Sequence, residues 1–161
     1  MGIVSGSSSP ADVVGVHVDT DNRQQAHPVN TSQLAELLAA TLAAQQGPIL
    51  AEVGLAFIPV EEMTALNIEH MGGAGPTDVL AFPIDGVGEP VAAPKGQPAI
   101  LGDIVICPAV AADAPQDLAD ELALLVVHGA LHLVGHDHAE PEETAIMQAL
   151  ERDMLARFYR P

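Results

Sequence analysis

Four of the seven histidines of this chain lie within eleven positions, in the stretch VVHGALHLVGHDHAE at residues 126–140. Apolar residues fill most of the gaps, so the first part of the stretch is typical of a buried helix. His128 and His132 are four positions apart, which places both imidazoles on one face of that helix. Such a pair is a common way for a helix to offer two ligands to one metal ion.

A third ligand has to come from outside the helical pair, and His136 and His138 are the candidates. On a straight helix His136 would lie roughly 12 Å from His128, because the rise is about 1.5 Å per residue. Rings so far apart do not converge on one zinc ion, whose bonds to nitrogen are about 2.0–2.1 Å. Gly135 favours a turn, since glycine adopts the left-handed conformation that ends helices. The predicted ligands are therefore His128, His132 and His138, with His136 peripheral.

Three histidines that leave a fourth position open resemble a catalytic zinc site more than a closed structural one. Zinc in an open site lowers the pKa of water toward neutrality and so provides a nucleophile for hydrolysis. The spacing H-x3-H-x2-G-x2-H also occurs in the metzincin proteases, where a glutamate follows the first histidine and acts as general base. Here that position is Gly129, which has no side chain to accept a proton, and this disfavours a protease.

The elements that position these residues follow from hydrophobic periodicity and from helix start and stop signals. Strands are expected at 13–20, 51–59, 77–85 and 100–108, helices at 31–46, 60–71, 115–135 and 141–158, and a Gly/Pro-rich loop at 86–99. We expect one α/β (α+β) domain over residues 13–161, preceded by a flexible tail at 1–12. Its mixed four-stranded sheet would be packed by about four to five helices, with the zinc site at the end of a central helix.

Charge and composition limit the classes of partner and compartment. The chain has 22 acidic residues, five basic ones and a net charge of −17, which opposes nucleic-acid binding through bulk electrostatics. One cysteine, Cys107, excludes an internal disulfide and suits a reducing compartment. The sequence shows no signal-peptide pattern and no apolar run of membrane-spanning length. A cytoplasmic protein without membrane contact is the expectation.

The segment HGALHLVGHDH, residues 128–138, resembles the signature H-G-x-L-H-L-x-G-x-D-H of the YbeY family of bacterial endoribonucleases. LNIEHMGGAGPTDVLAFPID at 66–85 and LGDIVICP at 101–108 resemble two further blocks of that family, in the same order. The resemblance covers roughly residues 50–155. It implies a single-strand-specific, zinc-dependent endoribonuclease, a hydrolase that matures the 3′ end of 16S ribosomal RNA and acts in ribosome biogenesis and quality control.

The same resemblance implies one zinc ion per chain, with another divalent metal left open, held by His128, His132 and His138. It also implies ribosomal RNA or the small ribosomal subunit as a partner, ribosomal or assembly proteins as further partners, and no DNA. Two positions depart from the family pattern: His136 stands where a tyrosine is frequent, and Met71 aligns with an arginine thought to contact RNA. The sequence does not say what replaces that arginine, so recognition through the ribosome or a protein partner is the expectation.

Other polar residues have weaker claims to a role. Asp137 is the candidate catalytic residue, because it could orient a histidine or act as the base, although a solvent-facing or capping role explains it as well. Asp78 and Asp103 either border the cleft or make turn and edge hydrogen bonds. The arginines near the C-terminus form a basic patch or pair with nearby acids, and the remaining histidines show no informative spacing: Arg152, Arg157 and Arg160; His17, His27 and His70.

Two alternatives to the ribonuclease remain open from the sequence. One is a non-catalytic ribosome-assembly factor, in which zinc only fastens the loop 135–140 to the helix. The other is a metal-dependent hydrolase of a different substrate. For a ribonuclease, the attacking group is either a water molecule activated by the metal or the 2′-hydroxyl of the RNA itself.

Overall fold

The computed structural model describes residues 15–46, 50–84 and 97–161, so the predicted tail at 1–12 and most of the loop 86–99 lie outside the described residues. The elements in chain order are β1 (Gly15–Asn22), α1 (Thr31–Gln46), β2 (Leu50–Phe57), α2 (Val60–Met71), β3 (Val79–Pro83), β4 (Ala99–Ile106), α3 (Pro108–Ala111), α4 (Leu118–Leu133) and α5 (Pro141–Phe158). The four long helices and the strands agree with the predicted elements to within a few residues. The short helix α3 was not predicted.

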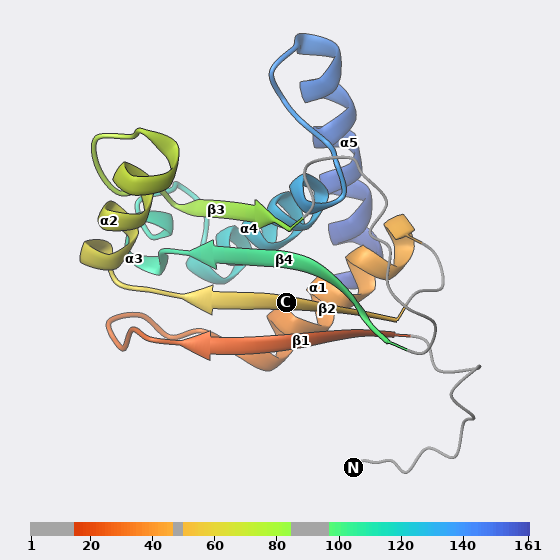
Figure 1. Ribbon diagram of the computed structural model, residues 1–161, viewed down its shortest axis with the longest axis horizontal. Coiled ribbons are helices and arrows are strands. Elements are labelled where there is room, and N and C mark those ends of the chain that lie inside the picture. Colours follow the sequence, from red (N-terminus) through yellow and green to blue (C-terminus); the bar gives the residue numbers. More distant parts are fainter. Residues whose placement is uncertain (1–14, 47–49, 85–96) are drawn as a thin grey trace.

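The strands form one mixed four-stranded sheet, as predicted, and their order in it is β1-β2-β4-β3 (Figure 1). β1 pairs with β2, and β2 with β4, in parallel, whereas β3 runs antiparallel to β4. β3 is therefore an edge strand of the sheet. Outside the sheet, it contacts helix α4. The fold class is α+β, and none of the helices in the described part is long and apolar enough to cross a membrane.

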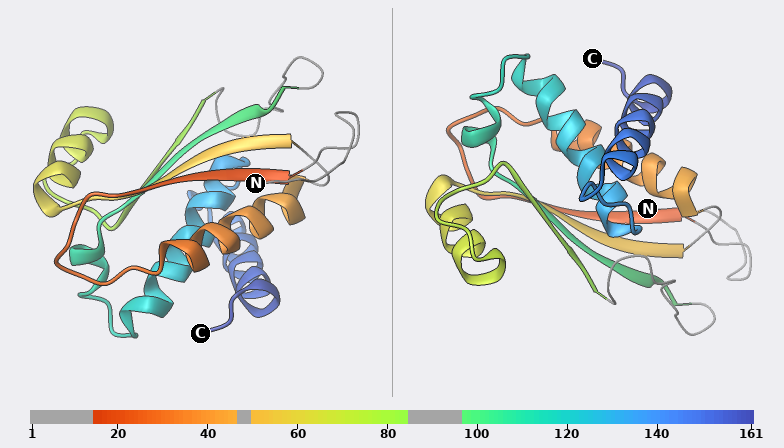
Figure 2. Two further views of the ribbon diagram at one scale, coloured as in Figure 1. Left: turned by 90° about the horizontal axis from the view of Figure 1, so that it is seen from below. Right: turned by 90° about the horizontal axis from the view of Figure 1, so that it is seen from above.

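The two faces of the sheet are covered unequally. Helices α1, α4 and α5 lie on one face, and α2 lies at one end of the other (Figure 2). Leucines of α1 and α4 form the main core with inward-facing residues of β2 and β4 such as Leu55 and Ile104. A smaller cluster lies under α2 and contains Ile58, Met63 and Cys107, so the single cysteine is a buried core residue.

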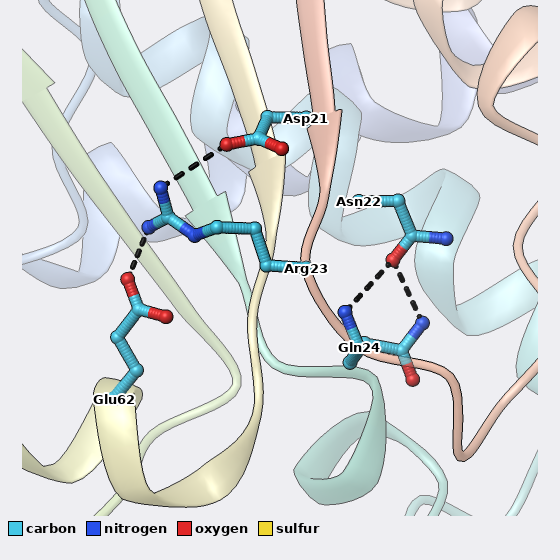
Figure 3. A network of polar contacts seen from close by, with 5 residues as sticks. All are labelled: Asp21, Asn22, Arg23, Gln24 and Glu62. Carbon is cyan, nitrogen blue, oxygen red and sulfur yellow. Dashed lines mark hydrogen bonds and ion pairs between the residues drawn. The ribbon is translucent and has the colours of Figure 1, made fainter.

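Polar contacts fasten α2 to the end of β1. The guanidinium of Arg23, just after β1, donates to the carboxylates of Asp21, at 3.1 Å, and of Glu62 in the first turn of α2 (Figure 3). The side-chain oxygen of Asn22 accepts a hydrogen bond from the Gln24 amide at 2.9 Å. The chain thus turns away from β1 with α2 held beside it.

Helix α4 packs so closely on β4 that one of its positions has no room for a side chain. A Cβ atom added at Gly129 would lie 2.8 Å from Cγ2 of Ile104. Apolar residues surround this contact on α4, and they are fully buried: Val126, Val127, Ala130 and Leu131. Gly129 therefore serves the close approach of helix and sheet.

A second contact sets how α5 runs back along α4. The Tyr159 hydroxyl donates to Asp120 in the first turn of α4, at 2.8 Å. Burial, together with Asp120, raises the pKa of Tyr159 to about 12, so the phenol is protonated and remains a donor at neutral pH. The C-terminal end of α5 is thereby held near the N-terminal end of α4.

We expect Gly129→Ala to lower the free energy of unfolding by about 1–3 kcal/mol, because the added methyl group overpacks the contact with Ile104. The loss should appear even though alanine favours a helix over glycine by about 1 kcal/mol. Urea denaturation measures it, and the double variant with Ile104→Ala should be less destabilised than the sum of the two single variants. Gly75→Ala is the control, since a Cβ there meets nothing within 4 Å. Equal stability of Gly129→Ala and wild type would contradict the packing argument.

Candidate metal centre

Two imidazoles of the cluster come from the last turns of α4. His128 and His132 are both half-buried, and their Nε2 atoms face each other at 3.2 Å. The helical spacing of four residues brings the rings together, with centroids 4.7 Å apart. Because α4 is packed on the sheet, these two rings have a defined position at the edge of the core.

The end of α4 has the geometry that the sequence predicted for Gly135. This glycine has a φ of 105°, a conformation that side chains disfavour. Its amide donates to the carbonyl of His132 at 3.1 Å, and the amide of His136 donates to that of Leu131 at 3.0 Å. This pair of bonds is a Schellman motif, which ends the helix and reverses the chain.

The reversal carries His138 back to the helical pair. Its ring centroid lies 5.4 Å from that of His128 and 5.0 Å from that of His132. One candidate ligand atom from each of the three residues lies within 4.8 Å of the others. The Thr144 hydroxyl of α5 donates to the His138 carbonyl at 3.0 Å and thereby holds the returning segment.

His136 points elsewhere. Its Nε2 lies 3.2 Å from the side-chain oxygen of Gln45 on α1, so this ring fastens the loop to α1. The sequence prediction left His136 peripheral and grouped His128, His132 and His138, and the structure brings together those same three rings. The group contains three histidines and no fourth metal-binding side chain among the described residues.

The donor set fits a transition-metal ion. Two nitrogens that share a tetrahedral zinc ion are about 3.3 Å apart, given bonds of about 2.0–2.1 Å. The separation of the His128 and His132 Nε2 atoms, 3.2 Å, is close to this value. Imidazole ligands suit zinc, copper, iron and nickel better than magnesium or calcium. The three side chains therefore fit such an ion.

Burial keeps one of these rings neutral. Desolvation lowers the pKa of His132, and the neighbouring His128 and His138 act in the same direction, whereas Asp137 opposes them. A neutral imidazole is the form that binds a metal ion. The environment of His132 therefore favours the state that a ligand needs.

The cluster opens into clefts on two sides. One, of about 400 Å³, runs along β3 and is lined by Met71, Thr77 and Asp78 together with all three histidines. The other, of about 420 Å³, lies against α5 and is lined by Thr144, Met147, Gln148 and Glu151, with His128 and His138. An extended ligand can therefore pass across the cluster from the edge strand to α5.

The remaining acidic candidates fall on different sides of the sheet. Asp78 borders the cleft along β3. Asp103 projects from the opposite face, into a separate cleft that Asp19, Asp21 and Arg23 also line. Asp137 is exposed, and its carboxylate accepts the backbone N–H of His138 at 2.7 Å. Its catalytic role stays a prediction.

The basic residues and the other histidines stay outside the cluster. Arg157 pairs with Asp153 at 3.5 Å on the exposed side of α5, which agrees with the i, i+4 interpretation. The Arg160 guanidinium binds backbone carbonyls at the end of the same helix. The three histidines without a spacing signal lie apart from the cluster: His17, His27 and His70.

Sequence reasoning missed the contacts that reach the cluster from other helices. His128 Nδ1 lies 2.6 Å from a carboxylate oxygen of Glu151, on α5. Gln45 and Thr144 hold the loop from α1 and α5. No local pattern connects these residues to the histidines, because the packing of separate helices brings them together.

Comparisons with known proteins agree with this description. The sequence model of the family described as "Endoribonuclease YbeY" matches residues 19–159. A protein of that name from Salinispora tropica is 53% identical over 117 residues, which cover 66% of this chain and 74% of the relative. One from Kineococcus radiotolerans is 39% identical over 152 residues, covering 89% and 88%. A Thermotoga maritima protein solved in solution shares the fold, with a TM-score of 0.54 and 21% identity over 88% of this chain and 90% of that one.

Replacing single histidines by alanine tests which rings bind the metal ion and which only hold the loop. Losing a residue that only hydrogen-bonds to a ligand lowers metal affinity about 10–100-fold. We expect His132→Ala, which removes a ligand itself, to lower the affinity by more than this. His136→Ala is the matched control and should lose clearly less affinity than His132→Ala, because its ring holds the loop through Gln45 and is not itself a ligand. Metal content after dialysis against zinc, measured by mass spectrometry, gives the comparison. Equal loss in both variants would show that the loop, and not the three rings, carries the metal.

Proposed function

This chain belongs to the YbeY family, and on that basis we propose that it is a metal-dependent endoribonuclease that hydrolyses phosphodiester bonds within single-stranded RNA. The convergence of three imidazoles at the end of α4 is the observation that supports this most strongly. The clefts on both sides of the cluster leave room for a strand that continues past the cleaved bond.

We further propose that His128, His132 and His138 hold one zinc ion. A zinc ion bound there would supply a Lewis acid, which polarises a phosphoryl oxygen or lowers the pKa of a bound water molecule. His128 and His132 are half-buried and exclude part of the surrounding water, His138 is exposed, and one candidate ligand atom from each of the three lies within 4.8 Å of the others. Asp137 is the proposed general base, because it is exposed beside His138 and carries a carboxylate.

The charge of the clefts bears on how RNA is held. Among the residues that the structure describes, neither cleft at the cluster is lined by a lysine or an arginine. Within these ranges the clefts therefore lack the side chains that usually bind phosphate. From membership of the YbeY family we propose ribosomal RNA at the 3′ end of 16S as the substrate, and the small ribosomal subunit or ribosomal and assembly proteins would present it. Ribosome biogenesis and quality control in the cytoplasm is the proposed setting, without DNA as substrate.

The alternative of a purely structural zinc has less support. Structural zinc sites are closed by four protein ligands. Only three candidate ligands form the cluster in the part of the chain that the structure describes, and His136 is engaged with Gln45. An open coordination position facing two clefts fits a reactive site better.

Cleavage of a fluorescent single-stranded RNA tests the activity. We expect zinc-loaded wild type to cut it, to leave a fully paired duplex and the matching DNA uncut, and His128→Ala to lose at least about 100-fold in rate, since removing a reaction's main electrostatic stabiliser costs about that much. His17→Ala, at an exposed position of β1, is the control and should cleave as the wild type does. Cleavage that survives in His128→Ala would argue against a reaction at this cluster.

Met71 offers a test of the RNA path, because it is half exposed in the cleft along β3. Met71→Arg adds one positive charge there and should raise kcat/KM for RNA about tenfold at low ionic strength. The slope of log kcat/KM against log salt concentration should steepen by about 1, as expected for one added phosphate contact. Met71→Gln, polar but uncharged, should show neither effect. Identical salt slopes for Met71→Arg and Met71→Gln would place the RNA outside this cleft.

A further inference from the structure

One carboxylate reaches the histidine cluster from another helix. Glu151 of α5 places Oε2 at 2.6 Å from Nδ1 of His128. The Glu151 side chain is 12% exposed and that of His128 is 25% exposed, so little water competes for this contact. In the described part of the chain, no other side-chain carboxylate forms a hydrogen bond or ion pair with a ring of the cluster.

The chemistry of the two groups determines where the ring carries its hydrogen. An ionised carboxylate only accepts hydrogen bonds, so Nδ1 of His128 must be the protonated nitrogen. In a neutral ring, the form that binds a metal ion, Nε2 then carries the free lone pair, and Nε2 is the atom that faces His132 at 3.2 Å. We propose that Glu151 is a positioning residue of the metal site, which selects the tautomer and the orientation of His128 needed for metal binding. This role rests on the proposed function of the cluster as a metal centre.

The fold holds Glu151 in this place independently of the histidine. Met147 and Met154 lie four residues before and three residues after it, on the same face of α5, and both are buried. Farther along, Tyr159 binds Asp120 of α4. Glu151 is eight positions before Tyr159, and His128 is eight positions after Asp120. The two contacts therefore have the same spacing along both helices, as expected for α4 and α5 running antiparallel. The carboxylate is therefore already in position before a metal ion binds.

Glu151 acts through His128 and is not a ligand itself. Its oxygen binds Nδ1, whereas the point that the three rings share lies toward Nε2, on the other side of the imidazole. The group of possible ligands accordingly contains three histidines and not Glu151. Partners in this position orient a ligand and raise its basicity, and their loss costs about 10–100-fold in metal affinity.

Two variants of equal size test the role without opening a cavity. Glu151→Gln keeps an oxygen that accepts the Nδ1–H, whereas Glu151→Met fills the same space with no acceptor. Asp153→Asn is the charge control, because it removes one negative charge from the exposed side of the same helix. Competition with a chromophoric chelator gives the zinc affinity of each protein. We expect Glu151→Met to bind zinc about 10–100-fold more weakly, Glu151→Gln to lose less, and Asp153→Asn to match the wild type.

The tautomer of His128 provides a second measurement that a merely structural role would not change. Long-range proton–nitrogen NMR spectra of the metal-free protein distinguish a protonated Nδ1 from a protonated Nε2. The wild type should show His128 protonated at Nδ1, whereas Glu151→Met, which offers no acceptor, and Glu151→Gln, whose amide can either accept from Nδ1 or donate to it, should show a larger share of Nε2 protonated. If Glu151 only joined α4 to α5, Glu151→Met would lower thermal stability and leave the tautomer as it is.

The possible outcomes separate this role from the proposed function. Wild type that binds no zinc would overturn the metal centre, and the role of Glu151 with it. Wild type that binds zinc, with the same affinity and the same His128 tautomer in Glu151→Met, would overturn the role of Glu151 alone. If Glu151→Met does not fold, the wild type decides, because a metal-free wild type with His128 protonated at Nε2 would contradict the proposal.

Discussion

The close packing of α4 against β4 is the constraint on which the rest of the structure depends. At Gly129 the helix comes so near Ile104 that no side chain fits between them. The neighbouring His128 is thereby fixed relative to the sheet, and His132 follows one turn later on the same face. A glycine in this position costs helix stability, by about 1 kcal/mol relative to alanine, and in return it places two imidazoles at the boundary between core and cleft. The chemistry of the cluster rests on this rigid support.

The turn that follows α4 and side chains from α1 and α5 then close the cluster around that helix. The Schellman motif at Gly135 turns the chain back, Gln45 of α1 holds the loop through His136, and α5 contributes Thr144 and Glu151. Thr144 fixes the loop backbone, Gln45 fixes the ring of His136, and Glu151 fixes the ring of His128. Preorganisation of this kind matters for a metal site, because ligands that are already aligned lose little conformational entropy when the ion binds.

The strongly negative charge of the chain and the proposed RNA substrate are compatible if the positive charge at the site comes from a metal ion. In the described parts of the chain, no lysine or arginine lines either cleft at the cluster. A third cleft, separate from the two at the cluster and on the opposite face of the sheet, is lined by Asp19, Asp21 and Asp103. The protein therefore separates its acidic sheet face from the histidine cluster, and a polyanion approaching the cluster would avoid that face.

The sequence by itself determined what depends on short-range geometry. Helical periodicity placed His128 and His132 on one face, and the freedom of Gly135 to take a positive φ predicted the turn that returns His138. Alternating apolar residues located the four strands, and apolar residues at helical spacing located the long helices. Together they gave the α+β class. Only the tertiary structure decided that Asp78 faces the cluster while Asp103 faces away, and that Glu151 meets His128. Periodicity sets angles within one element, whereas contacts between elements depend on the register of their packing, which side chains from the whole core determine together.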